Sequence, residues 1–177
     1  NKQDENKEKL VVGLECGYIP FNFTQQTDAN GGIKISNADG YANGYDVIIA
    51  KRIADALGKE LVIVKTEWDS LVPGVSAGTL DLVIAGMSPT AQRRESIDFS
   101  NAYYESNLVI VVRKDGAYAQ ASNLDDFNGA KIVAQQGTFH EKALQDQGEQ
   151  HGITVGTSMA TFPEMTIALN AKTIDGY

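Results

Sequence analysis

Cysteine and histidine are scarce in this sequence. Cys16 is the single cysteine among 177 residues, which excludes an internal disulfide and a cluster of metal-binding thiolates. Cys16 stands near a predicted strand end, where a nucleophile could also lie, but no basic partner accompanies it, so we expect a packed side chain. His140 and His151 lie eleven positions apart and lack the spacing of a metal motif, so we predict surface histidines and no metal site.

Positive charge is in deficit, with 15 Lys and Arg against 23 Asp and Glu and a formal net charge of −8. Such a surface repels phosphate backbones, and no basic run interleaved with aromatic residues offsets the deficit, so we predict no nucleic-acid partner. The Gly-x-Ser-x-Gly, Walker and Gly-x-Gly-x-x-Gly motifs are absent as well. Their absence removes the usual fingerprints of hydrolases and nucleotide-binding enzymes, and we predict no cofactor.

Long apolar runs are also lacking, since none approaches the roughly 18 residues that a membrane-spanning helix needs. The chain starts without a basic and hydrophobic leader. Residues 1–9 are instead polar and mixed in charge, and they predict a solvated tether, with the folded part beginning at Leu10. Apolar residues nevertheless make up 42% of the sequence, which is typical of a folded domain.

Apolar segments alternate with helical patterns in the first part of the chain. Strands are predicted at residues 10–14, 60–64, 80–85 and 108–112, and helices at 46–57 and 69–77. Asp46 is expected to cap the first helix and Gly58 to end it, while residues 33–35 suggest a small hairpin. Continuous apolar strands between helices predict a parallel sheet that is covered on both faces.

A second α/β unit is predicted after a crossover. Its elements are a short helix at 124–127, strands at 131–134, 153–155 and 173–177, and helices at 138–147 and 163–170. The expected fold class is α/β, with lobe 1 at residues 10–103, a hinge crossover at 104–109 and lobe 2 at 110–177. Two lobes joined in this way create a cleft at their seam, where small ligands bind.

Polar and aromatic side chains follow the ends of the predicted strands. Gly86 and Ser88 offer a carbonyl and a hydroxyl after the third strand, and Arg93 follows with a fork of donors that suits a carboxylate. A surface arginine that pairs with Glu95 is the alternative.

Glu15, Tyr18 and Trp68 follow the first two strands of the predicted sheet. A carboxylate beside aromatic faces suits a cationic side chain. Rings that only cover the core fit the same spacing, and both interpretations stay open.

Several motifs together resemble one known family. They are Gly-Tyr-Ala-Asn-Gly-Tyr-Asp-Val at 40–47, Trp-Asp-Ser-Leu-Val-Pro-Gly at 68–74, Asp-Leu-Val-Ile-Ala-Gly-Met-Ser-Pro-Thr at 81–90 with Arg93, Ile-Asp-Phe-Ser at 97–100, and Tyr103-Tyr104. In this order they resemble the extracytoplasmic polar amino-acid-binding proteins of ABC importers, which are family 3 of the extracellular solute-binding proteins. The resemblance extends over residues 10–177.

The resemblance implies a two-lobed clamshell of the type II periplasmic-binding-protein fold, which closes on a free L-amino acid and is not an enzyme. Arg93 would bind the α-carboxylate, helped by Ser88 and by the Gly137-Thr138 turn. The Gly86 carbonyl and Ser88 would receive the α-ammonium. The implied ligand-binding residues are Glu15, Tyr18, Trp68, Gly86, Met87, Ser88, Arg93, Gln135, Thr138 and Phe139, of which Glu15, Tyr18, Trp68, Gln135 and Phe139 would line the side-chain pocket.

The sequence departs from the family in two ways. Gln135 stands where glutamine-binding members have a lysine, and Glu15 where they have an aspartate, so the pocket is expected to favour arginine, lysine or ornithine over glutamate, with glutamine still open. Members of the family also continue past a segment like residues 174–177. We therefore expect the C-terminal part of the clamshell to be missing and the 177-residue chain alone to bind weakly.

The resemblance also implies partners and a location. We expect the permease subunits of an ABC importer as partners, and a periplasmic protein or a cell-surface lipoprotein whose signal has been removed and whose N-terminus is tethered to the membrane. Two alternatives stay open. One is a dehydratase acting on prephenate-like substrates, for which Glu15 and Glu164 are the available acids, and the other is the sensor domain of a receptor.

Overall fold

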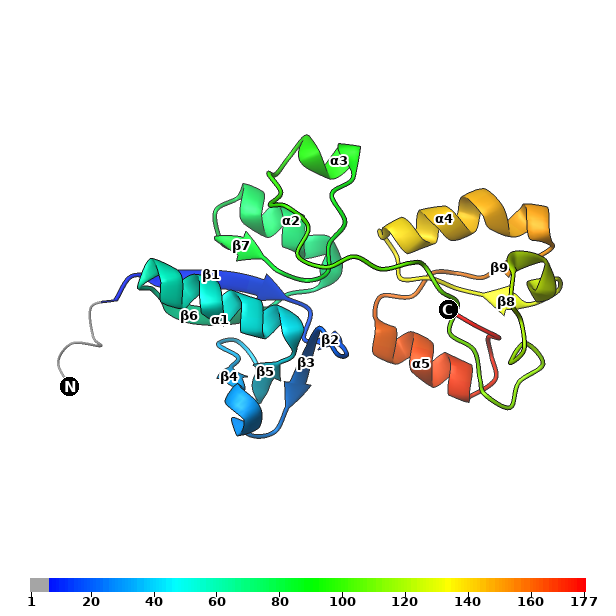
Figure 1. The fold of residues 1–177 in the computed structure, drawn as a ribbon, viewed down its shortest axis with the longest axis horizontal. Coiled ribbons are helices and arrows are strands. Elements are labelled where there is room, and N and C mark those ends of the chain that lie inside the picture. The colour runs from blue at the N-terminus through cyan, green and yellow to red at the C-terminus, as the bar shows by residue number, and fades with distance from the viewer. Residues whose placement is uncertain (1–6) are drawn as a thin grey trace. The chain divides into compact units, whose positions relative to one another are not determined.

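The computed structural model describes residues 7–177 of the chain, which divides after Tyr103 into two compact units (Figure 1). The second unit is Tyr104–Tyr177. Most of the predicted tether lies outside the described residues. Its last residue, Lys9, is already the first residue of a strand, and the carbonyl of Glu8 accepts a hydrogen bond from the backbone N–H of Glu60.

The first unit is built on a three-stranded parallel sheet in the order β6-β1-β7. The strands are β1 (Lys9–Leu14), β6 (Glu60–Lys65) and β7 (Leu82–Val83), and the helices are α1 (Tyr45–Leu57), α2 (Trp68–Ser76) and α3 (Ala91–Arg94). Alternate residues of β1 enter two different clusters. Val12 packs in the core that α1 covers, and Val11 packs against the cluster of Leu71 on α2. The sheet is therefore covered on both faces, as the continuous apolar strands predict.

A second, antiparallel sheet lies in the same unit, in the order β2-β3-β5-β4. Its strands are β2 (Gly17–Tyr18), β3 (Asn22–Gln25), β4 (Ile33–Lys34) and β5 (Tyr41–Asn43), with a short 3₁₀ turn, η1 (Ala29–Gly31), between β3 and β4. The hairpin predicted at residues 33–35 is present as the antiparallel pair β4 and β5.

Two details of the first unit correct the sequence predictions. Helix α1 is not capped by Asp46, because Gly44 holds the N-cap position with a φ of 119°, while the Asp46 side chain is 0% exposed. A side chain at Gly44 would collide with the carbonyl of Phe21, so the turn requires glycine. Strand β7 is shorter than the predicted strand 80–85, and the Asp81 carboxylate accepts a hydrogen bond of 2.8 Å from the backbone of Val11.

The second unit contains a short parallel pair of strands flanked by helices. Its elements are η2 (Leu124–Phe127), β8 (Lys131–Ile132), α4 (Phe139–Gly148), η3 (Glu149–His151), β9 (Thr154–Val155) and α5 (Phe162–Asn170). Ile132 packs with Phe127 and Ile153, whereas its neighbour Val133 packs with Met165 of α5. Successive residues therefore bury their side chains in two separate clusters.

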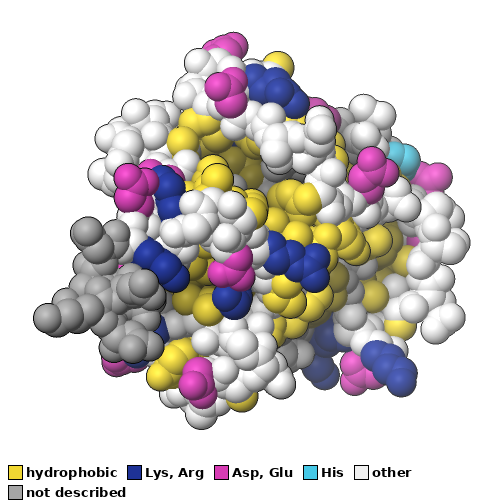
Figure 2. Space-filling model, turned by 60° about the vertical axis from the view of Figure 1, so that its left-hand side comes forward, with side chains coloured by type: hydrophobic (Ala, Val, Ile, Leu, Met, Phe, Trp, Pro, Cys, Tyr) yellow, Lys and Arg dark blue, Asp and Glu magenta, His cyan; other side chains and the backbone are white. Residues whose placement is uncertain are grey.

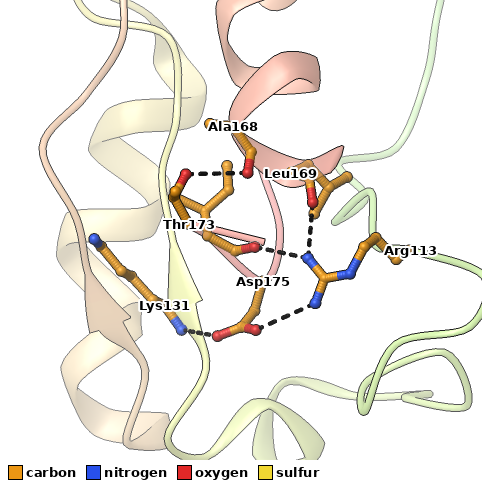
Figure 3. Close-up of polar contacts among 7 residues, drawn as sticks. Arg113, Lys131, Ala168, Leu169, Thr173 and Asp175 are labelled. Carbon is orange, nitrogen blue, oxygen red and sulfur yellow. Dashed lines mark hydrogen bonds and ion pairs between the residues drawn. The ribbon is translucent and has the colours of Figure 1, made fainter. Parts of the chain in front are cut away.

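The prediction of strands at residues 108–112 and 173–177 is wrong, because neither segment forms a strand in the structure. These segments are joined by a single bridge between Val112 and Gly176. At this bridge the backbones of Val111 and Tyr177 exchange two hydrogen bonds, of 2.8 and 3.2 Å. Side-chain contacts add to them, as Figure 3 shows: the Arg113 guanidinium donates to the carbonyls of Leu169 and Ile174 at 2.8 and 2.9 Å. It also lies 3.7 Å from the carboxylate of Asp175, which accepts a hydrogen bond from the backbone of Lys131.

Within residues 7–177, no helix is both long and apolar enough to cross a membrane. In the same residues no group of three or more His, Cys, Asp and Glu side chains is arranged to hold a metal ion. On the face drawn in Figure 2, basic and acidic side chains are interspersed and do not form a patch of one sign.

Candidate functional site

The parallel sheet of the first unit brings three predicted site segments to one edge. Leu14 is in register with Lys65, and Gly13 with Val83, so the three strands end side by side. The segments that follow them begin with Glu15, lead into α2 at Trp68 and contain Gly86. The chain crosses from β6 to β7 over β1, and α/β proteins bind ligands beyond the strand ends at such a crossing.

Arg93 lies in α3, which the Thr90 hydroxyl caps by accepting the Arg93 backbone N–H at 3.3 Å. The Arg93 guanidinium donates to the carbonyl of Ser88 at 2.9 Å and lies 5.2 Å from the centre of the Trp68 ring. These contacts hold the plane of the fork next to the loop that contains Gly86. Burial lowers the pKa of the guanidinium, and a partly dehydrated arginine attracts a carboxylate more strongly than an exposed one.

Tyr18 covers Gly86, which lies three residues after the end of β7. Gly86 has a φ of 63°, and a Cβ atom there would lie 3.3 Å from the Tyr18 ring. The Tyr18 ring is stacked on Phe21 with centroids 5.0 Å apart, and Phe21 meets Tyr45 edge-on at 6.2 Å. Tyr18 and Gly86 are thus brought together, and an aromatic row continues from them to the start of α1.

Sequence reasoning missed a hydrogen-bond network next to this loop, in which Asn22 and Asp46 are buried and Tyr103 is 36% exposed. The backbone N–H of Cys16 donates to Asn22 at 2.8 Å, and the Asn22 amide donates to Asp46 at 2.7 Å. The phenol of Tyr103 donates to the other Asp46 oxygen at 3.0 Å and accepts the N–H of Gly86 at 3.0 Å. The quoted Tyr103-Tyr104 motif was the only signal of this role, since Asp46 had been assigned to a helix cap.

Burial changes the ionisation of this network. Burial raises the pKa of Asp46, while hydrogen bonds from Asn22 and Tyr103 act in the opposite direction. Burial and the neighbouring Asp46 charge raise the pKa of the Tyr103 phenol, so it keeps its proton. Burial also raises the pKa of Cys16 to about 11, so the thiol is protonated at neutral pH and suits packing better than nucleophilic attack.

The remaining predicted residues of the first unit differ in their surroundings. Met87 is partly buried and packs against the cluster of Leu71 and Leu80. Glu15 is half-buried directly after β1, and Ser88 is exposed. Their predicted contacts with a ligand stay predictions.

In the second unit, three predicted residues lie at the start of α4. Gln135 is 2% exposed, and its amide donates to the carbonyl of Ala160 at 2.9 Å. The Thr138 hydroxyl donates to the Gln135 carbonyl at 2.6 Å and accepts the N–H of Glu141 at 3.2 Å, so Thr138 caps α4. Phe139 is 47% exposed. Their contacts with a ligand also stay predictions.

The Gly137-Thr138 turn was expected to offer donors to an anion. The N–H of Gly137 donates to the carboxylate of Glu141 at 2.8 Å, so a side chain of the same helix accepts this donor. Glu164 behaves similarly at α5, where its carboxylate accepts from the backbone of Thr161 at 3.2 Å in a capping box. This contact assigns the Glu164 side chain to the start of α5.

Comparison with known proteins places these features in a family. Residues 10–142 match the sequence model of the bacterial extracellular solute-binding proteins, family 3. The chain is 30% identical over 169 residues to the ABC transporter arginine-binding protein 1 of Escherichia coli (strain K12), covering 96% of this chain and 62% of that one. It is 35% identical over 136 residues to a probable histidine-binding protein of Campylobacter jejuni, covering 77% of this chain and 47% of that protein.

The fold is also similar to solved structures. An amino acid ABC transporter substrate-binding protein from Streptococcus pneumoniae, bound to L-arginine, matches with a TM-score of 0.81 and 32% identity, covering 95% of this chain and 65% of that one. This likeness confirms the predicted α/β periplasmic-binding-protein fold. All three similar proteins are binding proteins and not enzymes, as predicted. The chain spans about half to two thirds of their length.

Proposed function

This chain belongs to family 3 of the bacterial extracellular solute-binding proteins, and from this we propose that its protein captures a free L-amino acid outside the cytoplasm for an ABC importer. Arginine is the favoured ligand. The observation that carries the proposal is the Arg93 guanidinium, which Ser88 and Trp68 hold at the ends of parallel strands. Names of similar proteins support the ligand class, since they include arginine-binding and histidine-binding proteins.

Arg93 receives the α-carboxylate in this proposal. A guanidinium binds a carboxylate through two parallel hydrogen bonds, which fixes the direction of the ligand as well as its charge. The contact with the Ser88 carbonyl orients the guanidinium plane before a ligand arrives, and the Trp68 ring supports one of its faces. Less ordering of the side chain is then needed on binding.

The α-ammonium lies next to the Gly86 carbonyl and the Ser88 hydroxyl. A carbonyl and a hydroxyl accept hydrogen bonds from an ammonium without adding a net charge. Gly86 is exposed at the end of β7, and the absence of a side chain allows a ligand to approach its backbone closely.

The ligand side chain is recognised by Glu15, Tyr18 and Trp68. A cationic side chain pairs with the Glu15 carboxylate and with the ring faces, whereas a glutamate side chain is repelled by Glu15. The Trp68 ring also carries the Arg93 guanidinium, so in this proposal the ring that contacts the ligand side chain lies beside the group that binds its carboxylate.

The second unit contributes Gln135, Thr138 and Phe139 in this proposal. Phe139, which is 47% exposed at the start of α4, supplies an apolar surface to the ligand. Gln135 adds no positive charge, so it does not favour acidic ligands.

The permease subunits of an ABC importer are the proposed partners, and a membrane anchor at the N-terminus is the proposed attachment. A receptor sensor domain would use the same binding residues. The dehydratase alternative has less support, because Glu164 is engaged in the capping box of α5.

A calorimetric screen of the full-length protein tests the proposal. L-Arginine, L-lysine, L-ornithine, L-histidine, L-glutamine, L-glutamate and prephenate are titrated separately. We expect arginine to bind tightest and glutamate not to bind, and we expect Glu15→Gln to weaken arginine while sparing glutamine. The matched control is Glu67→Gln, an exposed residue just before α2. Tight glutamate binding would overturn the proposal that the ligand is cationic, and turnover of prephenate would overturn the proposal that the protein is a binding protein.

A further inference from the structure

Tyr103 contacts the candidate ligand loop from a distant point in the sequence. Its phenol oxygen accepts the N–H of Gly86 across 17 positions of sequence at 3.0 Å. Tyr103 is also the last residue of the first unit. Neither the family resemblance nor the predicted site gave this side chain a role.

We propose that Tyr103 is a positioning residue, which holds the peptide that precedes Gly86 so that the Gly86 carbonyl keeps the direction needed to receive the α-ammonium of the ligand. This inference rests on the proposed function, because it needs the ammonium to lie at that carbonyl. The contact is to the amide on one side of Gly86, and the proposed acceptor is the carbonyl on the other side.

A glycine at this position makes such support necessary. Gly86 has a φ of 63°, in the left-handed region that glycine reaches without strain. The same freedom lets its two peptide planes rotate widely when nothing holds them. A hydrogen bond on the N–H holds the first of these two planes, which removes part of this freedom and lowers the ordering cost of ligand binding.

The direction of each hydrogen bond in the network is determined by its chemistry. The N–H of Cys16 can only donate, so the Asn22 oxygen accepts it and the Asn22 amide nitrogen donates to Asp46. An ionised Asp46 can only accept, so the Tyr103 hydroxyl must donate to it. The phenol oxygen is then left as the acceptor for Gly86.

Tyr103 is itself held in place at two further points. The Tyr45 hydroxyl donates to the Tyr103 carbonyl at 3.0 Å, and the two rings are stacked with centroids 6.1 Å apart. The stacking of the two rings depends on neither hydroxyl, so it should hold the Tyr103 ring in both Tyr103→Phe and Tyr45→Phe. Removal of the hydroxyl alone should leave the ring where it is.

The test compares Tyr103→Phe with Tyr45→Phe in the full-length protein. Both variants lose one phenol hydroxyl of the same aromatic pair, but only Tyr103→Phe removes the acceptor of the Gly86 N–H. Calorimetry is carried out with L-arginine and with 5-guanidinopentanoate, which is arginine without its α-amino group. We expect Tyr103→Phe to weaken arginine about tenfold and the deaminated analogue less than about twofold, because only arginine uses the oriented carbonyl. Tyr45→Phe should change neither by more than about twofold.

Amide hydrogen exchange at Gly86, measured without ligand, provides a second readout. We expect protection of this amide in the unaltered protein and in Tyr45→Phe, and its loss in Tyr103→Phe. Equal weakening of both ligands by Tyr103→Phe, or unchanged protection of Gly86, would overturn the positioning role. If arginine does not bind the unaltered protein, the arginine proposal fails, while the exchange measurement still decides whether Tyr103 holds Gly86.

Discussion

The two units use polar side chains inside their packing for different purposes. In the first unit, Asp46 is 0% exposed, and its hydrogen-bond partner Tyr103 in turn holds the loop of Gly86. In the second unit, Arg113 binds the carbonyls of Leu169 and Ile174, which belong to the unit's own packing. The comparison indicates that the network of the first unit serves the proposed ligand site, whereas the network of the second unit serves its fold.

Removal of the Asp46 carboxylate should have the largest effect on stability. Asp46→Ala leaves the Asn22 amide and the Tyr103 hydroxyl without their acceptor inside the first unit, and we expect a loss of about 3 kcal/mol in unfolding free energy. Denaturant unfolding measures the loss, and hydrogen exchange resolved by peptide assigns it to a unit. Asp55→Ala, an exposed aspartate on the same helix, should change stability by less than about 0.5 kcal/mol. Equal losses in the two variants would contradict the buried role of Asp46.

The second unit should respond to the loss of Arg113. Arg113→Ala removes a donor shared by two carbonyls and the ion pair with Asp175, so we expect a loss of about 2 kcal/mol. Peptide-resolved hydrogen exchange should show this loss in residues 131–177 and not around Gly86. Faster exchange at Gly86 would break the distinction between the two networks.

A smaller effect is expected from the helix caps of the second unit. Thr138→Val and Thr161→Val each remove a side-chain acceptor at the start of a helix, and each should cost about 1 kcal/mol. Only Thr138→Val should also weaken arginine, because Thr138 belongs to the proposed ligand-binding set. Calorimetry on both variants separates the two roles, and an equal loss of affinity would assign Thr138 to the fold alone.

The smallest expected effects concern the pH dependence of stability. The contributions of Asp46, in the first unit, and Asp126, in the second, should change with pH in opposite directions. Burial raises the pKa of Asp46, so the part of its contribution to stability that depends on protonation is fully present below its ordinary pKa and is lost as the pH rises through the folded-state value. Its hydrogen bonds with Asn22 and Tyr103 do not depend on that proton. Hydrogen bonds from Ser122 and Asn123 lower the pKa of Asp126, so its contribution is present above the ordinary pKa and is lost as the pH falls.

Unfolding measured from about pH 3 to pH 7 checks these signs against Asp46→Asn and Asp126→Asn. Each variant should remove one of the two opposing dependences. A slope of the same sign for both residues would contradict the difference in their surroundings.

The sequence predicted the main elements because their signals are local. The parallel sheet follows from apolar runs and the end of α1 at Gly58 from a left-handed glycine. The helix predicted at residues 163–170 is present as α5, Phe162–Asn170. The edge of the sheet that collects Glu15, Trp68 and Gly86 follows from the parallel order of the strands.

The parts that sequence reasoning missed depend on contacts between distant residues. Asp46 accepts a hydrogen bond from Tyr103, 57 positions away in the sequence. Because this partner is distant, the residues around Asp46 do not distinguish a helix cap from a buried hydrogen-bond acceptor. Residues 173–177 have strand composition, but they make only isolated bridges at Gly176, and the Arg113 side chain binds the carbonyl of Ile174 within this segment. Whether such a segment pairs in a full ladder or in isolated bridges is decided by the packing of the whole unit.

The most direct test of the account is the affinity of the full-length protein for L-arginine in two neighbouring arginine variants. Arg93 lies over Trp68 and bonds to Ser88, whereas Arg94 on the same short helix lies over Phe99, 5.4 Å from its ring centre. We expect Arg93→Ala to weaken binding by more than about tenfold, which corresponds to about 1.4 kcal/mol, and Arg94→Ala to weaken it by less than about twofold. A loss below about tenfold for Arg93→Ala, or equal losses for the two variants, would contradict carboxylate recognition by Arg93.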